Sequence, residues 1–225
     1  MSGLGRWILI LVCWLVSGVV CAMGLQVRDT SITVKFYGVD EGLPSPDVTS
    51  IYRDSFGLMW IGTSGGGLSC FDAMSFRNYY PNERNSDSLA DGDIVDISED
   101  GDHNIWVATR SGLSCYNRTE MRFHNYCIYY QALDSTQHSG VLAVHVDREE
   151  QRWILTYRGL ARFNPWNSSL EFHDFPRRLG APTKPSNARI KEDKNGNLWV
   201  LLSGVLFCFD VETEEYLSLQ SSSYE

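Results

Sequence analysis

Short apolar and aromatic runs alternate with polar turns along most of the chain, in a pattern that occurs four times. The first two copies open with the strand-like runs Val48-Thr-Ser-Ile51 and Ile94-Val-Asp-Ile97, and a second run around a tryptophan follows each. Gly, Asp and Asn separate the runs, which is typical of antiparallel strands joined by tight turns. No stretch after the first two dozen residues keeps a helical apolar period. The pattern predicts an all-β protein.

An aspartate stands six residues before a tryptophan in every copy. The four pairs are Asp54 and Trp60, Asp100 and Trp106, Asp147 and Trp153, and Asp193 and Trp199. Successive tryptophans are 46, 47 and 46 residues apart. A period in the mid-forties with strand chemistry predicts a β-propeller built from four-stranded antiparallel blades. Because every copy carries the tryptophan, we interpret it as a packing residue between neighbouring blades rather than as a ligand contact.

The repeats divide residues 25–225, expected to be a partial β-propeller, into four blades. Their expected bounds are about 45–91, 92–138, 139–184 and 185–225. Residues 33–37 precede Gly42-Leu43-Pro44 as Phe76 to Tyr79 precede Ser88-Leu89, so we expect an outer strand there. The fourth repeat already has its own outer strand, which would leave residues 33–37 an orphan of a further blade. We therefore expect an incomplete ring. The alternative is a complete four-bladed ring, at the lower end of the usual range.

The first 24 residues have the layout of a signal peptide. Arg6 precedes an uncharged apolar run from Trp7 to Val20, and the small-residue segment Cys21-Ala-Met-Gly24 follows. This order predicts export and cleavage, and hence a periplasmic mature chain of residues 25–225. Two alternatives remain open. One is an uncleaved anchor, although the run is shorter than the roughly 20 residues of a spanning helix. The other is lipidation at Cys21.

Charge and composition narrow the possible partners. The chain has 225 residues, of which 43% are hydrophobic and 12% aromatic, enough for a sizeable core. Its formal net charge is −9. An acidic domain without a basic stripe is a poor nucleic-acid binder, so we expect no nucleic-acid partner.

The four cysteines beyond the leader argue against disulfides. Cys70, Cys115 and Cys208 occupy the same repeat position, where the third repeat has Arg162, and Cys127 lies outside it. Rotation around the ring carries equivalent positions well beyond the ~7 Å Cα separation that a disulfide allows. We therefore predict reduced, unpaired thiols. No CxxC spacing is present, so a zinc site is not expected.

Few residues suggest a ligand, a metal or catalysis. Residues 100–104 place acidic and amide side chains at alternating positions, as calcium loops do, but the glycine and the acidic residue expected further on are absent. An Asx turn explains the segment better. The histidines form no recognisable metal or catalytic set, so no cofactor, metal or catalytic residue is predicted. Trp166 lies outside the repeat position and is the better candidate for a ligand contact, or a loop anchor.

Two segments of the first repeat carry a resemblance to a known family. Asp54-Ser-Phe-Gly-Leu-Met-Trp-Ile-Gly-Thr63 and Gly67-Leu-Ser-Cys-Phe-Asp72 resemble the repeat of the two-component regulator propellers. The segment Phe36 to Pro44 is similar to the start of the first blade in those proteins. The resemblance covers about residues 33 to 219 and is weaker in the third repeat, where Arg148-Glu-Glu-Gln151 replaces a glycine-containing turn.

The resemblance implies a sensor. These propellers form the periplasmic sensing half of hybrid two-component histidine kinases, whose members continue into further blades, a membrane helix and a kinase. This sequence has no kinase motif and no second apolar span, so we do not expect it to be an enzyme. We expect the ligand-sensing part of such a kinase, truncated before the membrane and kinase regions, which responds to glycan fragments.

The expected partners follow from the same resemblance. They are a small molecule or an oligosaccharide and the missing blades and kinase of the parent protein, which would lie in the inner membrane. The alternative function is a stand-alone exported propeller that binds a carbohydrate or a protein. A propeller enzyme such as a lyase is a third class. Because function inferred from fold is an analogy, the ligand and its binding residues stay open.

Overall fold

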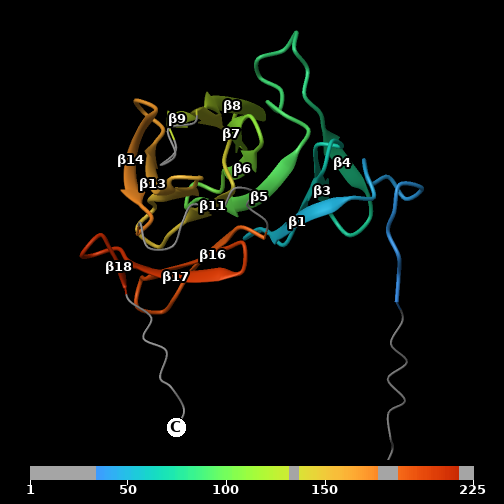
Figure 1. Ribbon diagram of the computed structural model, residues 1–225. Helices are drawn as coiled ribbons and strands as arrows, with labels where there is room; N and C mark the ends of the chain where they lie inside the picture. The colour runs from blue at the N-terminus through green and yellow to red at the C-terminus, as the bar shows by residue number, and fades with distance from the viewer. Residues whose placement is uncertain (1–33, 132–136, 177–186, 218–225) are drawn as a thin grey trace, which may run out of the picture. The chain divides into compact units, whose positions relative to one another are not determined.

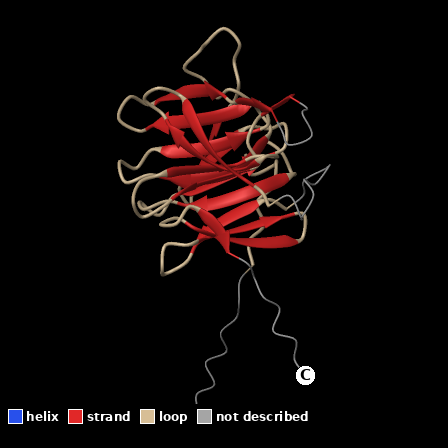
Figure 2. Ribbon diagram, turned by 60° about the vertical axis from the view of Figure 1, so that its left-hand side comes forward, coloured by secondary structure: helices blue, strands red, loops and turns tan. Residues whose placement is uncertain are grey.

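The computed structural model describes residues 34–131, 137–176 and 187–217, and every regular element among them is a β-strand (Figure 1, Figure 2). Residues Tyr37–Glu225 form one compact unit. Within the described residues, we find no helix long and apolar enough to span a bilayer. The leader at residues 1–24 lies outside the described part of the chain.

Four four-stranded antiparallel sheets follow one another along the chain, and in each the strands are ordered as in the sequence. The first blade comprises β1 (Val48–Arg53), β2 (Met59–Thr63), β3 (Leu68–Phe71) and β4 (Phe76–Tyr79). The second comprises β5 (Ile94–Glu99), β6 (Ile105–Thr109), β7 (Gly112–Asn117) and β8 (Arg122–Cys127). The third comprises β11 (Ala143–Val146), β12 (Arg152–Leu155), β13 (Gly159–Asn164) and β14 (Ser169–Asp174). The fourth comprises β15 (Arg189–Glu192), β16 (Leu198–Leu202), β17 (Val205–Asp210) and β18 (Glu215–Leu217).

The four blades stand in a ring around their first strands (Figure 1). The predicted all-β propeller is therefore confirmed, and each expected repeat range contains one blade. One element was not predicted: a hairpin of β9 (Tyr129–Gln131) and β10 (Gln137–Ser139) links the second and third blades.

The turn between the first two strands of each blade needs a left-handed residue three positions after the repeat aspartate. Gly57 and Gly196 fill that position in the first and fourth blades, with φ of 85° and 93°. His103 and Glu150 fill it in the other two, with φ of 64° and 60°. An L-residue adopts this region at a cost of only roughly 1 kcal/mol. The third blade can therefore keep the turn without the glycine of the family repeat.

The expected outer strand at residues 33–37 is not formed. Residue 33 lies outside the described residues, and residues 34–38 are irregular. The ring of Tyr37 instead packs edge-on against Phe71 at 4.8 Å. Each described third strand already pairs with the fourth strand of its own blade, so the segment has no third-strand edge to join.

The core consists of three clusters, each shared by two consecutive blades. We call the side of a blade that packs on the preceding blade its leading face, and the opposite side its following face. The following face contributes the repeat tryptophan and a leucine from the third strand, such as Trp60 and Leu68. The leading face of the next blade contributes side chains of its first three strands, such as Ile97, Val107 and Tyr116. Among the described residues, no such cluster joins the fourth blade to the first.

Candidate functional site

The repeat aspartates and tryptophans form one hydrogen-bond motif in all four blades. In the first blade, Asp54 accepts hydrogen bonds from the Phe56 and Leu58 amides and, at 2.7 Å, from the indole Nε1 of Trp60. The same carboxylate-to-indole bond measures 2.8 Å at Trp106, 2.7 Å at Trp153 and 3.0 Å at Trp199. Each aspartate therefore closes its turn and fixes its indole, which leaves little of the carboxylate for a ligand.

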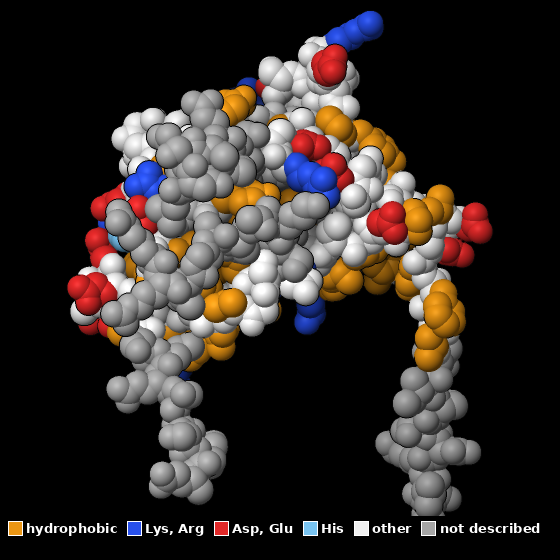
Figure 3. All heavy atoms as spheres, viewed as in Figure 1, with side chains coloured by type: hydrophobic (Ala, Val, Ile, Leu, Met, Phe, Trp, Pro, Cys, Tyr) orange, Lys and Arg blue, Asp and Glu red, His pale blue; other side chains and the backbone are white. Residues whose placement is uncertain are grey.

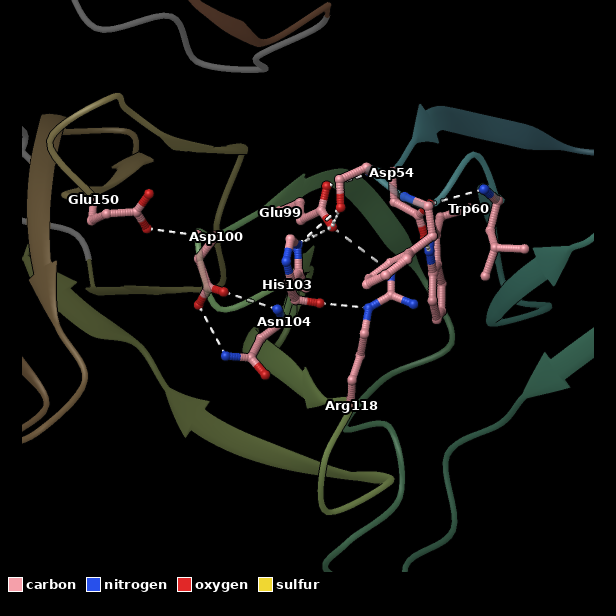
Figure 4. Close-up of polar contacts among 12 residues, drawn as sticks. Asp54, Trp60, Glu99, Asp100, His103, Asn104, Arg118 and Glu150 are labelled. Carbon is pink, nitrogen blue, oxygen red and sulfur yellow. Dashed lines mark hydrogen bonds and ion pairs between the residues drawn. The ribbon is translucent and has the colours of Figure 1, made fainter.

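An arginine crosses each of the three packed junctions between blades. Arg118 of the second blade binds the Asp54 carboxylate (Figure 4). Arg152 of the third reaches Asp100 at 3.3 Å. Arg162 of the third blade reaches Glu214 of the fourth at 3.0 Å. All three guanidinium groups also lie within 5.5 to 5.8 Å of a repeat indole ring, in range for a cation–π contact. The contacts of Arg118 and Arg152 join neighbouring blades, whereas Arg162 lies over Trp153 of its own blade and reaches the next one through Glu214.

The charged partner keeps Asp54 ionised although it is buried. Burial alone would raise the pKa of this carboxyl, but hydrogen bonds from Trp60 and Arg118 outweigh it and hold the pKa below its usual value. We interpret the Asp54–Arg118 pair as structural, because both oxygens of the Asp54 carboxylate already accept hydrogen bonds from its own turn, Trp60 or Arg118.

The loop considered for calcium is an Asx-type turn. Asp100 Oδ1 accepts a hydrogen bond from the backbone N–H of Asn104 at 2.8 Å (Figure 4). Its Oδ2 accepts the Trp106 indole N–H. Nearby, Ser55 Oγ contacts both Glu99 Oε1 at 2.7 Å and His103 Nδ1 at 2.9 Å. The Ser55 hydroxyl and the Glu99 carboxylate therefore both lie beside Nδ1 of His103. In a catalytic triad the two groups contact different nitrogens of the imidazole, so this arrangement is not a triad. The described residues contain no group of three metal-binding side chains.

The thiols are unpaired, as predicted. Cys70, Cys115, Cys127 and Cys208 are all free. Burial raises the pKa of Cys70 to about 11 and that of Cys115 to about 12, so both stay protonated and unreactive at neutral pH.

One cavity lies where the first strands of all four blades meet. It has a volume of about 680 Å³, within the range of small-molecule sites. Its rim carries Ser64, Arg110 and Tyr157, each four residues after a repeat tryptophan. Its wall carries Thr49, Val95, Leu142 and Ala188, one from the first strand or its approach in each blade. We call this cavity the mouth.

Charged groups face each other in the mouth. Asp93 accepts a hydrogen bond from Ser64 Oγ at 2.9 Å, and Arg110 Nε lies 3.8 Å from the same carboxylate. Across the mouth, Arg189 donates to the carbonyl oxygens of Thr49 at 3.0 Å and Ala188 at 2.7 Å. The Arg189 contact to Thr49 also links the fourth blade to the first. Figure 3 shows acidic and basic side chains side by side near the middle of its view.

The unpredicted hairpin helps to shape the rim. The Tyr130 hydroxyl, from β9, accepts a hydrogen bond from the backbone N–H of Tyr157 at 3.0 Å. Gly140 follows β10 with φ of 86°, and a Cβ at this position would lie 2.0 Å from the Arg110 carbonyl oxygen. Only glycine permits this approach. Two rim residues, Arg110 and Tyr157, are thus held in place by the connection between the second and third blades.

A half-buried carboxyl, that of Asp96, lies in a second, smaller cavity of about 180 Å³, which shares Arg189 with the mouth. Burial raises the pKa of Asp96 to about 6, although Arg189 and the amides of Ile97 and Val144 oppose the change. Asp96 accepts the Val144 N–H at 3.3 Å, which ties the first strand of the third blade to that of the second.

Sequence reasoning named Trp166 as a candidate ligand contact, and the mouth residues were missed. The position four residues after each tryptophan holds Ser64, Arg110, Tyr157 and Ser203, so it varies where the rest of the repeat is kept. Variation at one fixed repeat position was the available signal. Trp166, the notable tryptophan outside the repeat, is 94% exposed and lines a separate cavity of about 310 Å³. Its indole therefore does not anchor the loop.

The fold and the repeated Asp–Trp hydrogen bond define the class of this protein. It is a β-propeller whose repeat tryptophans pack between neighbouring blades. Residues 42–65 and 88–111 match the family described as two component regulator propeller. The predicted resemblance is confirmed, and these two segments are repeats of that type. None of the curated proteins matches the chain.

Solved structures show the same fold. The extracellular domain of the putative hybrid two component system BT3049 from B. thetaiotaomicron superposes with a TM-score of 0.63 at 20% identity, over 84% of this chain and 24% of that one. The extracellular domain of the putative one component system BT4673 from the same organism gives 0.62 at 20% identity, over 86% and 26%. Virginiamycin B lyase from Staphylococcus aureus gives 0.56 at 14% identity, over 78% and 56%. The chain thus spans about a quarter of the length of the first two domains.

Proposed function

We propose that this chain is the ligand-sensing propeller portion of a hybrid two-component sensor histidine kinase, and that it binds its ligand in the mouth. One observation carries the proposal: repeats of the two component regulator propeller type build a ring with a cavity that receives side chains from all four blades. Two solved structures with the same fold are extracellular domains of putative signalling systems, which supports a sensing role. Glycan fragments are the ligand class that the family resemblance suggests.

The chain acts outside the cytoplasm in this proposal. Its first 24 residues have the order of a signal peptide, and the structural neighbours are extracellular domains. Expression in a Gram-negative host, osmotic-shock extraction and N-terminal sequencing test this point. A periplasmic product that starts after Ala22 or Gly24 is expected. A product that keeps Met1, or one that stays in the membrane, would contradict it.

Further blades belong to the same sensor in this proposal. Ile51, on the leading face of the first blade, is 62% exposed, whereas its equivalents Ile97 and Val144 are buried. Leu206, on the following face of the fourth blade, is 47% exposed. Additional blades between these two faces would bury both, would replace the Arg189–Thr49 contact and widen the mouth, and the kinase would lie beyond them. Reading the coding sequence past Glu225 checks this arrangement directly.

Ligand binding by the mouth is the decisive test. Isothermal titration of the purified protein against a panel of plant and host oligosaccharides should give saturable binding, which Tyr157→Ala weakens and Tyr129→Ala, outside the cavity, leaves unchanged. No binding to any member of the panel, or equal loss in both variants, would count against a sensing mouth. We propose no catalysis by this chain, so incubation with the panel and divalent metal should release no shorter product.

A stand-alone exported binding propeller is the second candidate. The hydrogen bond from Arg189 to Thr49 favours it, because the fourth blade already touches the first without added blades. A downstream reading frame without blades or a kinase, together with saturable binding by the chain alone, would make this candidate the better one.

A further inference from the structure

We infer that the mouth selects an acidic saccharide, whose carboxylate or sulfate group is bound between Arg110 and Arg189. The inference rests on the proposed function, since it names the chemical class of the ligand for the same cavity. Four properties of the mouth support it: its local charge, the unused donors of Arg189, the weak ion pair of Arg110, and the hydroxyl groups around them.

The charge of the mouth is opposite in sign to that of the protein. The chain carries a formal net charge of −9. The mouth contains two guanidinium groups, Arg110 and Arg189, but a single carboxylate, Asp93. A cleft with an excess of one sign of charge attracts ligands of the opposite sign, even when the whole molecule repels them. An anion therefore meets its favourable potential in this cavity.

Arg189 retains hydrogen-bond donors for an anion. A guanidinium group carries five N–H donors, and Arg189 uses two of its nitrogens on the carbonyl oxygens of Ala188 and Thr49. Within the described parts of the chain, no carboxylate lies within ion-pair distance of it. The two carbonyl contacts fix the plane of the guanidinium, and Asp96 in the adjoining cavity interacts with its charge from beyond ion-pair distance. A fixed fork of this kind matches the two oxygens of a carboxylate or sulfate.

Arg110 is free to change partners. Its side chain is 72% exposed, and its Nε lies 3.8 Å from Asp93, longer than a hydrogen bond. Exposed ion pairs of this length contribute little, so a ligand anion can take the guanidinium at small cost. Asp93 keeps its hydrogen bond from Ser64 when this happens. Arg110 and Arg189 come from the second and fourth blades, on opposite sides of the ring, so the anion would lie across the mouth.

The remaining polar groups suit a sugar rather than a bare anion. Thr49 Oγ1 is buried without a hydrogen-bond partner, and Ser64 and Tyr157 add hydroxyl groups at the rim. Leu142 and Val95 supply apolar wall between them. Saccharides combine hydroxyl groups with apolar ring faces, and ligand sites commonly place a few polar groups on such an apolar lining.

The probes for the test are uronate tetrasaccharides of α and β linkage, their methyl-esterified forms, and neutral hexose tetrasaccharides. Titration calorimetry of the full chain should show binding to at least one uronate, weakened roughly tenfold or more by esterification, since a hydrogen bond to a charged group has that magnitude. Arg110→Gln and Arg189→Lys should each weaken it similarly. Arg189→Lys retains the positive charge. A loss of affinity in this variant therefore tests whether the forked shape of the guanidinium is needed.

Matched controls separate the outcomes. Arg84→Gln removes an exposed arginine outside the mouth and should leave the affinity unchanged, and thermal unfolding verifies that each variant is folded. Equal losses in the Arg84 and Arg110 variants would overturn the inference in favour of diffuse charge attraction. Binding of neutral and esterified sugars as tight as that of uronates would also overturn it, yet leave a sensing mouth intact. Binding of none of the probes would overturn the inference and count against the proposed function.

Discussion

The three packed junctions of the ring and the junction between its fourth and first blades use the same repeat positions with different results. Trp60, Trp106 and Trp153 are fully buried, whereas Trp199 is half-buried. Each of the first three also meets an aromatic ring of the next blade, at centroid distances of 5.5 to 6.1 Å. Phe71, at the equivalent position in the first blade, packs against Tyr37 and Phe76.

This difference shows that the repeat motif is not by itself a core. The Asp193–Trp199 hydrogen bond is formed like the others, so the motif folds within one blade. Burial comes only when the next blade supplies an aromatic ring from its own sequence. A single blade thus leaves apolar surface unburied on its faces, which is why repeat arrays need their ends covered.

The largest expected effect separates two of the tryptophans. Trp106→Ala should cost about 3–5 kcal/mol of unfolding free energy, because it leaves a cavity between two blades. Trp199→Ala removes a half-buried ring and should cost only about 1–2 kcal/mol. Urea unfolding monitored by circular dichroism measures both. Equal midpoints with unchanged m-values would mean that the fourth junction is as well packed as the second.

Removing the arginine that crosses the first junction should have the next largest effect. Arg118→Ala leaves the buried Asp54 carboxylate without its counter-charge, and we expect a loss of about 1–3 kcal/mol. Arg84→Ala, an exposed control, should change stability by less than about 0.5 kcal/mol. Because the ion pair lowers the pKa of Asp54, the stability it contributes is present at neutral pH and lost as the pH falls. An Arg118 variant with the wild-type acid midpoint would argue against this pair.

Asp96 should give the opposite pH dependence. Its folded pKa is raised to about 6, so the folded state holds the proton more tightly than the unfolded state does. The stability from this group is full below pH ~4 and is lost as the pH rises through ~6, by up to about 3 kcal/mol. Asp96→Asn removes the titration. The wild type should therefore lose stability relative to this variant between pH 4 and 6, and a constant difference would refute the assignment.

The smallest effect concerns self-association. Ile51 and Leu206 expose apolar surface on the two faces that lack a packed partner, and such patches promote association. Light scattering of the purified protein should show oligomers at high concentration. Leu206→Ser should reduce them while changing stability by less than about 1 kcal/mol. Leu160→Ser, at the equivalent buried position, should instead destabilise the fold strongly. A monodisperse wild type at all concentrations would count against exposed faces.

The sequence was sufficient to predict the fold because its signals are local and repeated. The Asp–Trp spacing, the strand patterns and the single repeat position shared by Cys70, Cys115 and Cys208 gave the blades and the free thiols. Two features depended on tertiary context instead. Residues 34–38 have the pattern of an outer strand, but no third-strand edge is open to them. The β9–β10 hairpin lies outside the repeat, so the spacing of the repeats could not predict it.

The mouth was beyond prediction for a related reason. Arg110 and Arg189 are 79 residues apart in the sequence and occupy different repeat positions, so no spacing relates them. They share one cavity because a ring brings the inner strands of opposite blades together. Arg162, where the other repeats have cysteine, was a visible irregularity, and it proved to be an inter-blade contact to Glu214.

The exchange of the four repeat indole N–H protons tests the central claim most directly, since the same hydrogen bond exists in every blade and only its burial differs. Tryptophan labelled with ¹⁵N allows each indole to be followed by NMR after transfer to D₂O, with assignments from single substitutions. We predict slow exchange at Trp60, Trp106 and Trp153, markedly faster exchange at Trp199, and the fastest at the exposed Trp166. Protection of Trp199 equal to that of the other three would contradict an unpacked fourth junction and show that the four blades close on their own.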